Sequence, residues 1–307
     1  MTSTRPAPPR GDELAAAGLD VAPSAPTGPG RGRSALDRFR RNPRAIVGAT
    51  IVVALCLMAL LAPLLAPYPP EVQSLALRYR PPSPEHWMGT DSFGRDVLSR
   101  AIWAARVSLA VGVLAVAVSI SISVVVGSLA GYYGGRLDNL LMRFTDMMLA
   151  FPTLFLLIAI VAAFGSQLPI LIAVLGLTSW ELGARVVRGE VLSLKTREFV
   201  QAARALGAGD ARIIRRHILP NVLPIVIISA TIRVPLTILL EAALSYLGLG
   251  VQPPIASWGN MVADGKAALR IAWWVTAFPG AFIFAAVMAF NLLGDGLRDA
   301  LDPRMKT

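Results

Sequence analysis

The run Ala45-Ile-Val-Gly-Ala-Thr-Ile-Val-Val-Ala-Leu-Cys-Leu-Met-Ala-Leu-Leu-Ala-Pro-Leu-Leu-Ala66 decides the fold class of this chain, because it contains no charged residue. A helix needs about 20 apolar residues to cross the ~30 Å hydrocarbon core of a membrane. Lipid offers no water to backbone N–H and C=O groups, so a segment that crosses it forms a helix. Pro67, Pro69 and Pro70 then end the pattern. We therefore predict a membrane-spanning helix here.

Five further apolar stretches of comparable length follow along the chain. The six predicted spans cover about residues 45–66, 102–130, 140–164, 169–187, 222–247 and 277–293. Hydrophobic residues make up 55% of the chain, charged residues 16%, and mean hydropathy is +0.60. A soluble domain is about one-quarter charged, so this composition excludes a wholly soluble protein and an intrinsically disordered one. The predicted fold class is an all-α polytopic membrane protein with six transmembrane helices.

The first 33 residues differ from the rest in composition. They are rich in Pro, Ala, Gly and Arg and have neither helical nor strand periodicity, which predicts a disordered cytoplasmic tail. The first apolar run starts too late and is too long for a secretory signal peptide. The chain is thus expected to consist of a tail over residues 1–33 and a transmembrane domain over residues 34–307.

The basic residues determine the predicted orientation of the spans. The net charge is +10, with 29 Lys and Arg residues. If both termini share one side, 21 of these residues lie there and six lie on the other side. Because basic loops stay in the cytoplasm, we expect both termini and a loop over about residues 188–220 to be cytoplasmic, with outer segments at 68–101 and 248–276. A membrane therefore explains the basic charge better than nucleic acid does, and no nucleic-acid partner is expected.

The sequence offers no candidate for an enzyme active site. The nearest approach to a phosphate-binding P-loop, residues 259–267, has the wrong spacing and lacks the hydroxyl residue. His86 and His217 fall on opposite sides of the predicted membrane, so they cannot share a metal ion. The single cysteine, Cys56, excludes a cysteine-built zinc site. We expect no catalytic residue, no metal site and no cofactor in this chain.

Several polar and aromatic residues of the outer segments are expected to have structural roles. Asp91 and Asp96 come shortly before a predicted helix, where a carboxylate can cap the free N–H groups and suits the positive end of the helix dipole. Trp258, Trp273 and Trp274 are expected at the membrane interface, where an amphipathic ring is favoured.

The most informative stretch is residues 198–220, in the predicted cytoplasmic loop. Its first half is rich in Ala and favours a helix, which Gly207 then ends. A second helix follows, and Pro220 opens the fifth span. The pattern predicts a helix, a turn and a second helix that protrude below the membrane. Such a unit could dock on a protein partner or lie on the anionic headgroups of membrane lipid.

This stretch resembles the EAA loop of binding-protein-dependent ABC importer permeases, whose pattern is Glu-Ala-Ala, three residues, Gly, nine residues, Ile, one residue and Leu-Pro. The residues that match, with all spacings intact, are Ala202, Ala203, Gly207, Leu219 and Pro220. The chain departs from the pattern at Gln201, which replaces Glu, and at His217, which replaces Ile. Glu198, about one helical turn before Gln201, is a candidate for the missing carboxylate.

The resemblance covers roughly residues 35–305. The motifs that carry it are His86–Arg100, Gly131–Gly135, Leu247–Pro253, Ser257–Gly259 and Asn291–Pro303. As a set they resemble the second permease of the oligopeptide/dipeptide (Opp/Dpp) subfamily. The fold that this implies is that of a type I ABC importer permease, whose cytoplasmic loop carries the coupling helices.

The resemblance also implies a function and partners. The chain would be a non-catalytic permease subunit of an ATP-driven importer for dipeptides or oligopeptides in the bacterial inner membrane. Its partners would be a homologous permease, two ATPases that bind ATP and Mg²⁺, and an extracytoplasmic substrate-binding protein. The residues that would couple the permease to the ATPases are Glu198, Gln201, Ala202, Ala203, Gly207, Leu219 and Pro220. The same architecture could import a nickel complex, glutathione or haem, and a stand-alone secondary transporter is a further alternative.

Two ionisable residues lie inside the fifth predicted span. Arg233 is 12 residues past Asn221, or about 18 Å into the helix, and Glu241 is about 30 Å in. Charged residues at membrane depth usually face protein or water. Both residues could therefore line the substrate path or gate, or form a structural bridge to the partner permease.

Overall fold

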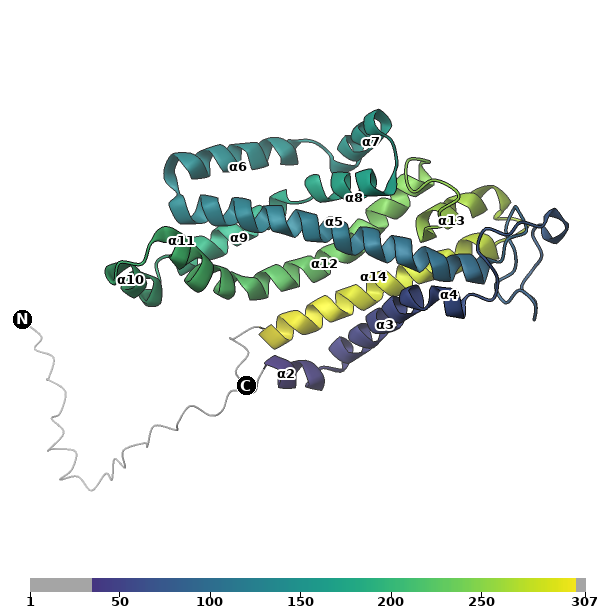
Figure 1. Ribbon diagram of the computed structural model, residues 1–307, viewed down its shortest axis with the longest axis horizontal. Coiled ribbons are helices and arrows are strands. Elements are labelled where there is room, and N and C mark those ends of the chain that lie inside the picture. The colour runs from purple at the N-terminus through teal and green to yellow at the C-terminus, as the bar shows by residue number, and fades with distance from the viewer. Residues whose placement is uncertain (1–34, 302–307) are drawn as a thin grey trace, which may run out of the picture.

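The computed structural model describes residues 35–301, which fold almost entirely into helices (Figure 1). In chain order the first elements are α2 (Ala35–Arg41), α3 (Pro43–Leu60), α4 (Ala62–Leu65), η1 (Leu75–Leu77), α5 (Val97–Tyr133), α6 (Gly135–Ala150), α7 (Thr153–Phe164) and α8 (Leu168–Leu177). They are followed by α9 (Glu181–Leu194), α10 (Glu198–Ala205), α11 (Asp210–Ile213), η2 (Ile214–Ile218), α12 (Leu219–Tyr246), α13 (Trp258–Gly265), η3 (Lys266–Ala268) and α14 (Trp274–Leu301). The predicted tail, residues 1–33, lies outside the described residues.

The bundle has two distinct ends. At one end lie the loop over residues 66–96 and α13, here called the loop end; at the other lie α10, α11 and η2, here called the knob (Figure 1). Helix α5, with 37 residues, is about 55 Å long and runs from one end to the other. The start of α2 and the end of α14 lie toward the knob. His86 and His217 are therefore at opposite ends, as predicted.

Four helical segments are long and apolar enough to cross a membrane, and six spans result if each of two bent pairs counts as one. The four are Pro43–Leu60, Val97–Tyr133, Asp210–Tyr246 and Trp274–Leu301. The predicted spans over residues 140–164 and 169–187 are each bent in the structure, because α6 and α7 meet at 85° and α8 and α9 at 44°. The first bend has a local cause: Pro152 has no N–H and disfavours a helical conformation at Phe151.

Helix α5 begins at Val97, earlier than the predicted boundary at residue 102, because Asp96 caps it. The Asp96 Oδ2 atom accepts a hydrogen bond from the Ser99 N–H at 2.7 Å, which confirms the predicted capping role.

Small residues on α5 allow this helix to pack closely on α9. A Cβ atom on Gly127 or Gly131 would lie within 2.8 Å of a backbone oxygen of α9, so larger residues at these positions would separate the two helices.

The prediction that Trp258 and Trp274 lie at a membrane interface is wrong. Both rings are buried, and each indole N–H donates to a backbone oxygen, that of Ala101 at 3.0 Å and that of Thr90 at 3.1 Å respectively. Burial is possible because these carbonyls satisfy the indole donors when α13 and α14 fold against α5 and the loop before it. Trp273 alone of the three is exposed.

Candidate functional site

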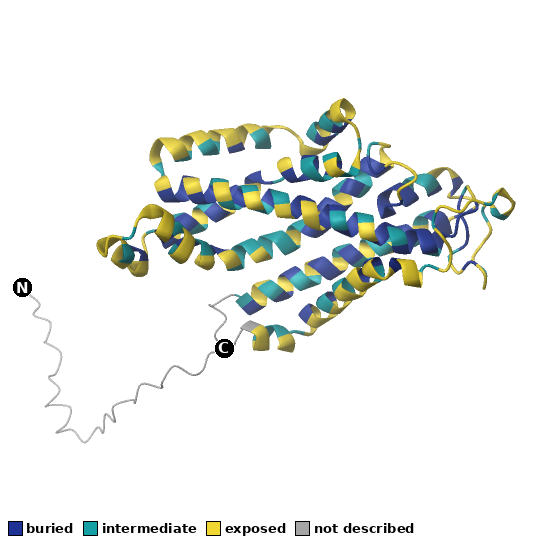
Figure 2. Cartoon of the chain, viewed as in Figure 1, coloured by how far each residue is buried: buried dark blue, intermediate teal, exposed yellow. Residues whose placement is uncertain are grey.

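The knob is a helix, a glycine turn and a second helix, as predicted. Helix α10 ends at Ala205 with Leu206 as its C-cap, and Gly207 follows with φ = +79°, a conformation that favours glycine after a helix end. Leu206, at the tip, is 89% exposed, and no atom lies within 4 Å of the position that a Cβ on Gly207 would occupy. The tip therefore projects free of the rest of the chain, while α10 and most of the knob surface are exposed (Figure 2).

Apolar contacts and one strong hydrogen bond attach the knob to the bundle. Val200, Ile213 and Ile218 are fully buried in a cluster with residues of α9 and the first turn of α12. The Tyr132 hydroxyl at the end of α5 donates to Asp210 Oδ1 at 2.6 Å and accepts from an Arg204 Nη atom at 3.4 Å. This second hydrogen bond is the main reason that the pKa of Arg204 is raised above its ordinary value.

The predicted coupling residues fall into two places. Glu198, Gln201, Ala202 and Gly207 are exposed and Ala203 is half-buried, all on α10 or the turn after it. The Gln201 side-chain amide donates to the Lys195 carbonyl at the end of α9, at 3.3 Å. Gln201 thus serves a local hydrogen bond that an ionised Glu, which has no donor, could not make.

Leu219 and Pro220 lie apart from the tip, where the knob runs into the bundle. The second knob helix does not end before the fifth span, because η2 is a π-helical turn that continues α11 directly into α12. The Leu219 N–H bonds to the Ile214 carbonyl, five residues back, and the Asn221 side chain donates to the His217 carbonyl at 2.6 Å. The π-turn accommodates Pro220, which lacks an N–H.

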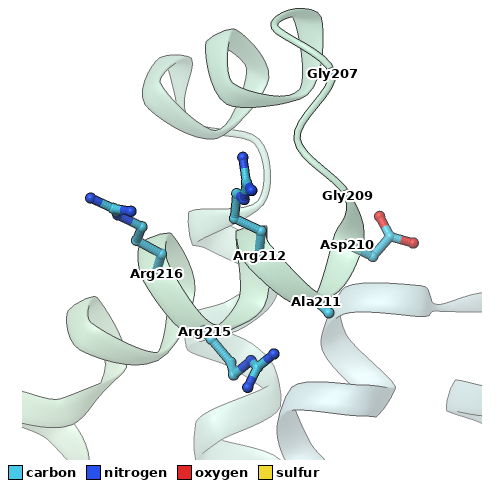
Figure 3. Close-up of a pocket in the computed structure, with 7 residues that line it drawn as sticks. All are labelled: Gly207, Gly209, Asp210, Ala211, Arg212, Arg215 and Arg216. Atoms are coloured by element: carbon cyan, nitrogen blue, oxygen red, sulfur yellow. The ribbon is translucent and has the colours of Figure 1, made fainter.

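Three arginines of the second knob helix surround a surface hollow of about 640 Å³. They are Arg212, Arg215 and Arg216, and the hollow is completed by Gly207, Gly209, Asp210 and Ala211. In Figure 3, Arg212 points toward the segment that carries Gly207, whereas Arg215 points to the opposite side. All three are exposed, and none forms an ion pair with a residue in the described part of the chain. The sequence analysis did not single them out, although their spacing shows a basic helix.

Arg233 and Glu241 are not brought together. Arg233, near the middle of α12, is half-buried and donates to the Ser179 carbonyl in the break between α8 and α9. Glu241 is 0% exposed, and its Oε1 atom accepts hydrogen bonds from Ser245 at 2.7 Å and Ser257 at 2.9 Å. Since Ser257 caps α13, this carboxylate links α12 to α13 within the chain. Glu241 is thus enclosed by its own chain, whereas Arg233 lines a small cavity.

An ionic cluster at the loop end was missed by the sequence analysis. Asp91, expected as a helix cap, is fully buried instead, and its Oδ2 atom accepts from Arg95 Nε at 2.7 Å and from Arg100 Nη1 at 2.5 Å. Asp264 of α13 joins the cluster through Arg100 Nη2 at 3.3 Å. No group of three or more His, Cys, Asp or Glu side chains within residues 35–301 could hold a metal ion.

Two family models match this chain. Residues 123–307 match the model described as "Binding-protein-dependent transport system inner membrane component", and residues 30–82 match "N-terminal TM domain of oligopeptide transport permease C". The fold is also similar to a solved chain from the MetNI methionine ABC transporter in inward-facing conformations. That chain has a TM-score of 0.55 and 20% identity, over 67% of this chain and 96% of its own length. The predicted fold class is thereby confirmed.

Several curated relatives align with this chain over most of its length and most of their own. The oligopeptide transport system permease protein OppC of Bacillus subtilis is 42% identical over 89% of this chain and 90% of its own. The dipeptide transport system permease protein DppC of the same organism is 43% identical over 88% and 84%, and the glutathione transport system permease protein GsiD of Escherichia coli is 44% identical over 88% and 89%. The resemblance to the Opp/Dpp subfamily is confirmed. The chain therefore belongs to the family of inner membrane permeases of binding-protein-dependent transport systems.

Proposed function

We propose that this chain is one of two permease subunits of an ATP-driven importer for dipeptides or oligopeptides. The names of the relatives OppC and DppC support a peptide substrate. The second subunit would be a homologous permease, and the two would form the translocation path together. An extracytoplasmic binding protein would deliver the substrate, and two ATPases would bind ATP and Mg²⁺, so this chain itself performs no catalysis and holds no cofactor.

The knob is the observation that carries this proposal. It is a short helix pair with an exposed tip at Leu206 and with small residues, Ala202 and Ala203, that permit close approach by a partner. Closure of the ATPase pair on ATP would push the knob. Because η2 joins the knob to α12 without a break, that displacement would move α12 as a rigid body and reorient the path.

The knob would face the cytoplasm, and the loop end would face the binding protein outside. The distribution of basic residues supports this orientation, since the knob and the described ends of the chain carry more Lys and Arg than the loop end. The three knob arginines, which form no ion pair within residues 35–301, would then meet acidic groups of an ATPase or the headgroups of membrane lipid. Both termini would be cytoplasmic.

Glutathione is a second candidate substrate, because GsiD is as similar to this chain as the peptide permeases are. The decisive experiment reconstitutes the chain with its partner permease, ATPases and binding protein in vesicles. Uptake of labelled dipeptides, longer peptides and glutathione is then compared with and without ATP. Peptide uptake that needs ATP and all four kinds of subunit is expected. Peptide uptake by this chain alone, or uptake of glutathione only, would refute the peptide importer.

The coupling role predicts that Gly207→Val reduces transport per ATP hydrolysed severalfold. A β-branched residue at φ = +79° is strained, so the turn between α10 and α11 must change shape. Gly209→Val is the matched control, because Gly209 has φ = −70° and no atom within 4 Å of a Cβ. The measurement is substrate-stimulated ATPase activity beside uptake in the assembled complex. Equal effects of the two substitutions would show that the turn conformation is not what couples the subunits.

A further inference from the structure

A small internal cavity lies where α5, α8 and α12 meet. Its volume is about 30 Å³, and its polar lining consists of Ser119, Ser179, Arg233 and Thr237. One water needs about 10–15 Å³ of such space, so the cavity accommodates about two water-sized groups. Two oxygen atoms of a carboxylate have that size. The other lining residues are apolar, which leaves Arg233 as the charged group that faces the cavity.

The guanidinium of Arg233 has unused hydrogen-bonding capacity. It has five N–H donors, and within residues 35–301 only the bond to the Ser179 carbonyl is present. Two of the three hydroxyls of the cavity are engaged elsewhere: Ser119 donates to the same Ser179 carbonyl at 2.8 Å, and Thr237 donates to the backbone oxygen of Arg233 at 3.0 Å. An acceptor that entered this cavity would therefore find its donors in the Arg233 guanidinium and the Ser179 hydroxyl, of which Arg233 alone is charged.

The charge of Arg233 also lacks a direct counter-ion. In the described part of the chain no carboxylate oxygen lies within 4.0 Å of it, and the buried Glu181 attracts it only from a greater distance. Arg233 is the fifteenth of the 28 residues of α12, or about 21 Å along it, which is near mid-membrane. A cation at this depth is costly unless it faces an anion or water.

We propose that Arg233 binds the terminal carboxylate of the substrate midway along the translocation path. The inference rests on the proposed function, because peptides carry a free carboxylate and the planar guanidinium fork matches one. Leu236, on the cavity lining, is 61% exposed, so the cavity lies close to a surface of the bundle from which a substrate can enter. A phospholipid headgroup lies too far from mid-membrane to occupy this site. A carboxylate of the partner permease is the rival occupant.

The test compares two peptides that differ only in a free C-terminal carboxylate or a C-terminal amide. Uptake of each is measured in the complete reconstituted complex with wild-type chain, Arg233→Gln, Arg233→Lys and the control Arg106→Gln. Arg106 is an exposed cation of α5 that lies over the Trp103 ring and away from the cavity. Uptake is normalised to the peptide occupancy of the binding protein. Because that protein is the same in every assembly, its own preference cancels when each variant is compared with wild type.

In Arg233→Gln, uptake of the free-carboxylate peptide should fall about tenfold or more, the usual effect of losing a charge-assisted hydrogen bond, whereas uptake of the amide should fall less. Arg233→Lys should keep part of the preference, and Arg106→Gln should change neither peptide. An equal loss of both peptides in Arg233→Gln and Arg233→Lys would overturn the proposal and indicate a bond to the partner permease or a role in holding the α8–α9 break. An unchanged ratio would overturn it as well. If the wild-type complex imports neither peptide, the proposed function fails first, and this inference fails with it.

Discussion

The loop end and the knob use the same residue type, arginine, in opposite ways. At the loop end Arg95 and Arg100 are buried, and Asp91, with no exposed surface, binds both. At the knob Arg212, Arg215 and Arg216 are exposed and have no ion-pair partner among residues 35–301. Charge at the loop end thus holds the chain to itself. Charge at the knob is available to molecules outside the chain.

The two ends also differ in how they are held to the helical bundle. The loop end has little regular secondary structure between α4 and α5, so buried polar contacts replace a helical core there, among them His86 Nδ1 to Asp96 Oδ1 at 2.9 Å. The knob is attached through one apolar cluster and a few hydrogen bonds, of which Tyr132–Asp210 is the shortest. We therefore expect local opening of the structure to be rarer at the loop end than at the knob.

The largest effect is expected for Asp91→Ala, which would leave Arg95 and Arg100 buried beside each other with no close carboxylate except Asp264. Removing one partner of a buried ion pair costs about 3–5 kcal/mol, so the free energy of unfolding should fall by this order. The measurement is thermal or chemical denaturation of the purified complex. Asp264→Ala is the control: this side chain is partly exposed and lies 3.3 Å or more from its arginines, so less than ~1 kcal/mol is expected. If both variants lost a similar free energy of unfolding, Asp91 would not be the main buried partner of the two arginines.

An intermediate effect is expected for Glu241→Ala. The hydroxyls of Ser245 and Ser257 would lose their shared acceptor, at a cost of about 1–3 kcal/mol. Since Ser257 caps α13, amide hydrogen exchange in α13 should become faster. Glu241→Gln keeps an acceptor oxygen, so its exchange should stay close to that of wild type. Equally fast exchange in the Gln variant would show that the negative charge, and not the hydrogen bonds, holds α13.

The smallest effect is expected for Tyr132→Phe, which removes the hydrogen bond to Asp210 and the longer one from Arg204, at a combined cost of about 1 kcal/mol between α5 and the knob. Amide exchange should become faster in α10 and α11 and should stay unchanged at the loop end. Tyr133→Phe is the matched control, because the Tyr133 ring is exposed and its hydroxyl makes no hydrogen bond in the described structure. A response at the loop end would mean that the two ends are not independent.

The sequence predicted the elements whose cause is local. Spans α3, α5, α12 and α14 follow from long apolar runs, and the knob follows from an Ala-rich helix ended by Gly207. Pro152 gave a signal for the first bend that the analysis did not use. The bend between α8 and α9 had no such signal. There, Ser119 of α5 and Arg233 of α12 bind the Ser179 carbonyl, and neither is near it in the sequence.

Hydropathy, basic-residue asymmetry and motif spacing by themselves determined the membrane class, the knob and the family. Each depends on residues close together in the chain, because a helix satisfies its backbone hydrogen bonds within its own segment. Only the tertiary structure decided which polar groups are buried and with what. Arg100 meets Asp264 across 164 residues, and Trp258 meets Ala101 across 157. A carboxylate such as Asp91 can cap a helix or bind two arginines, and the choice depends on which distant segments fold against it.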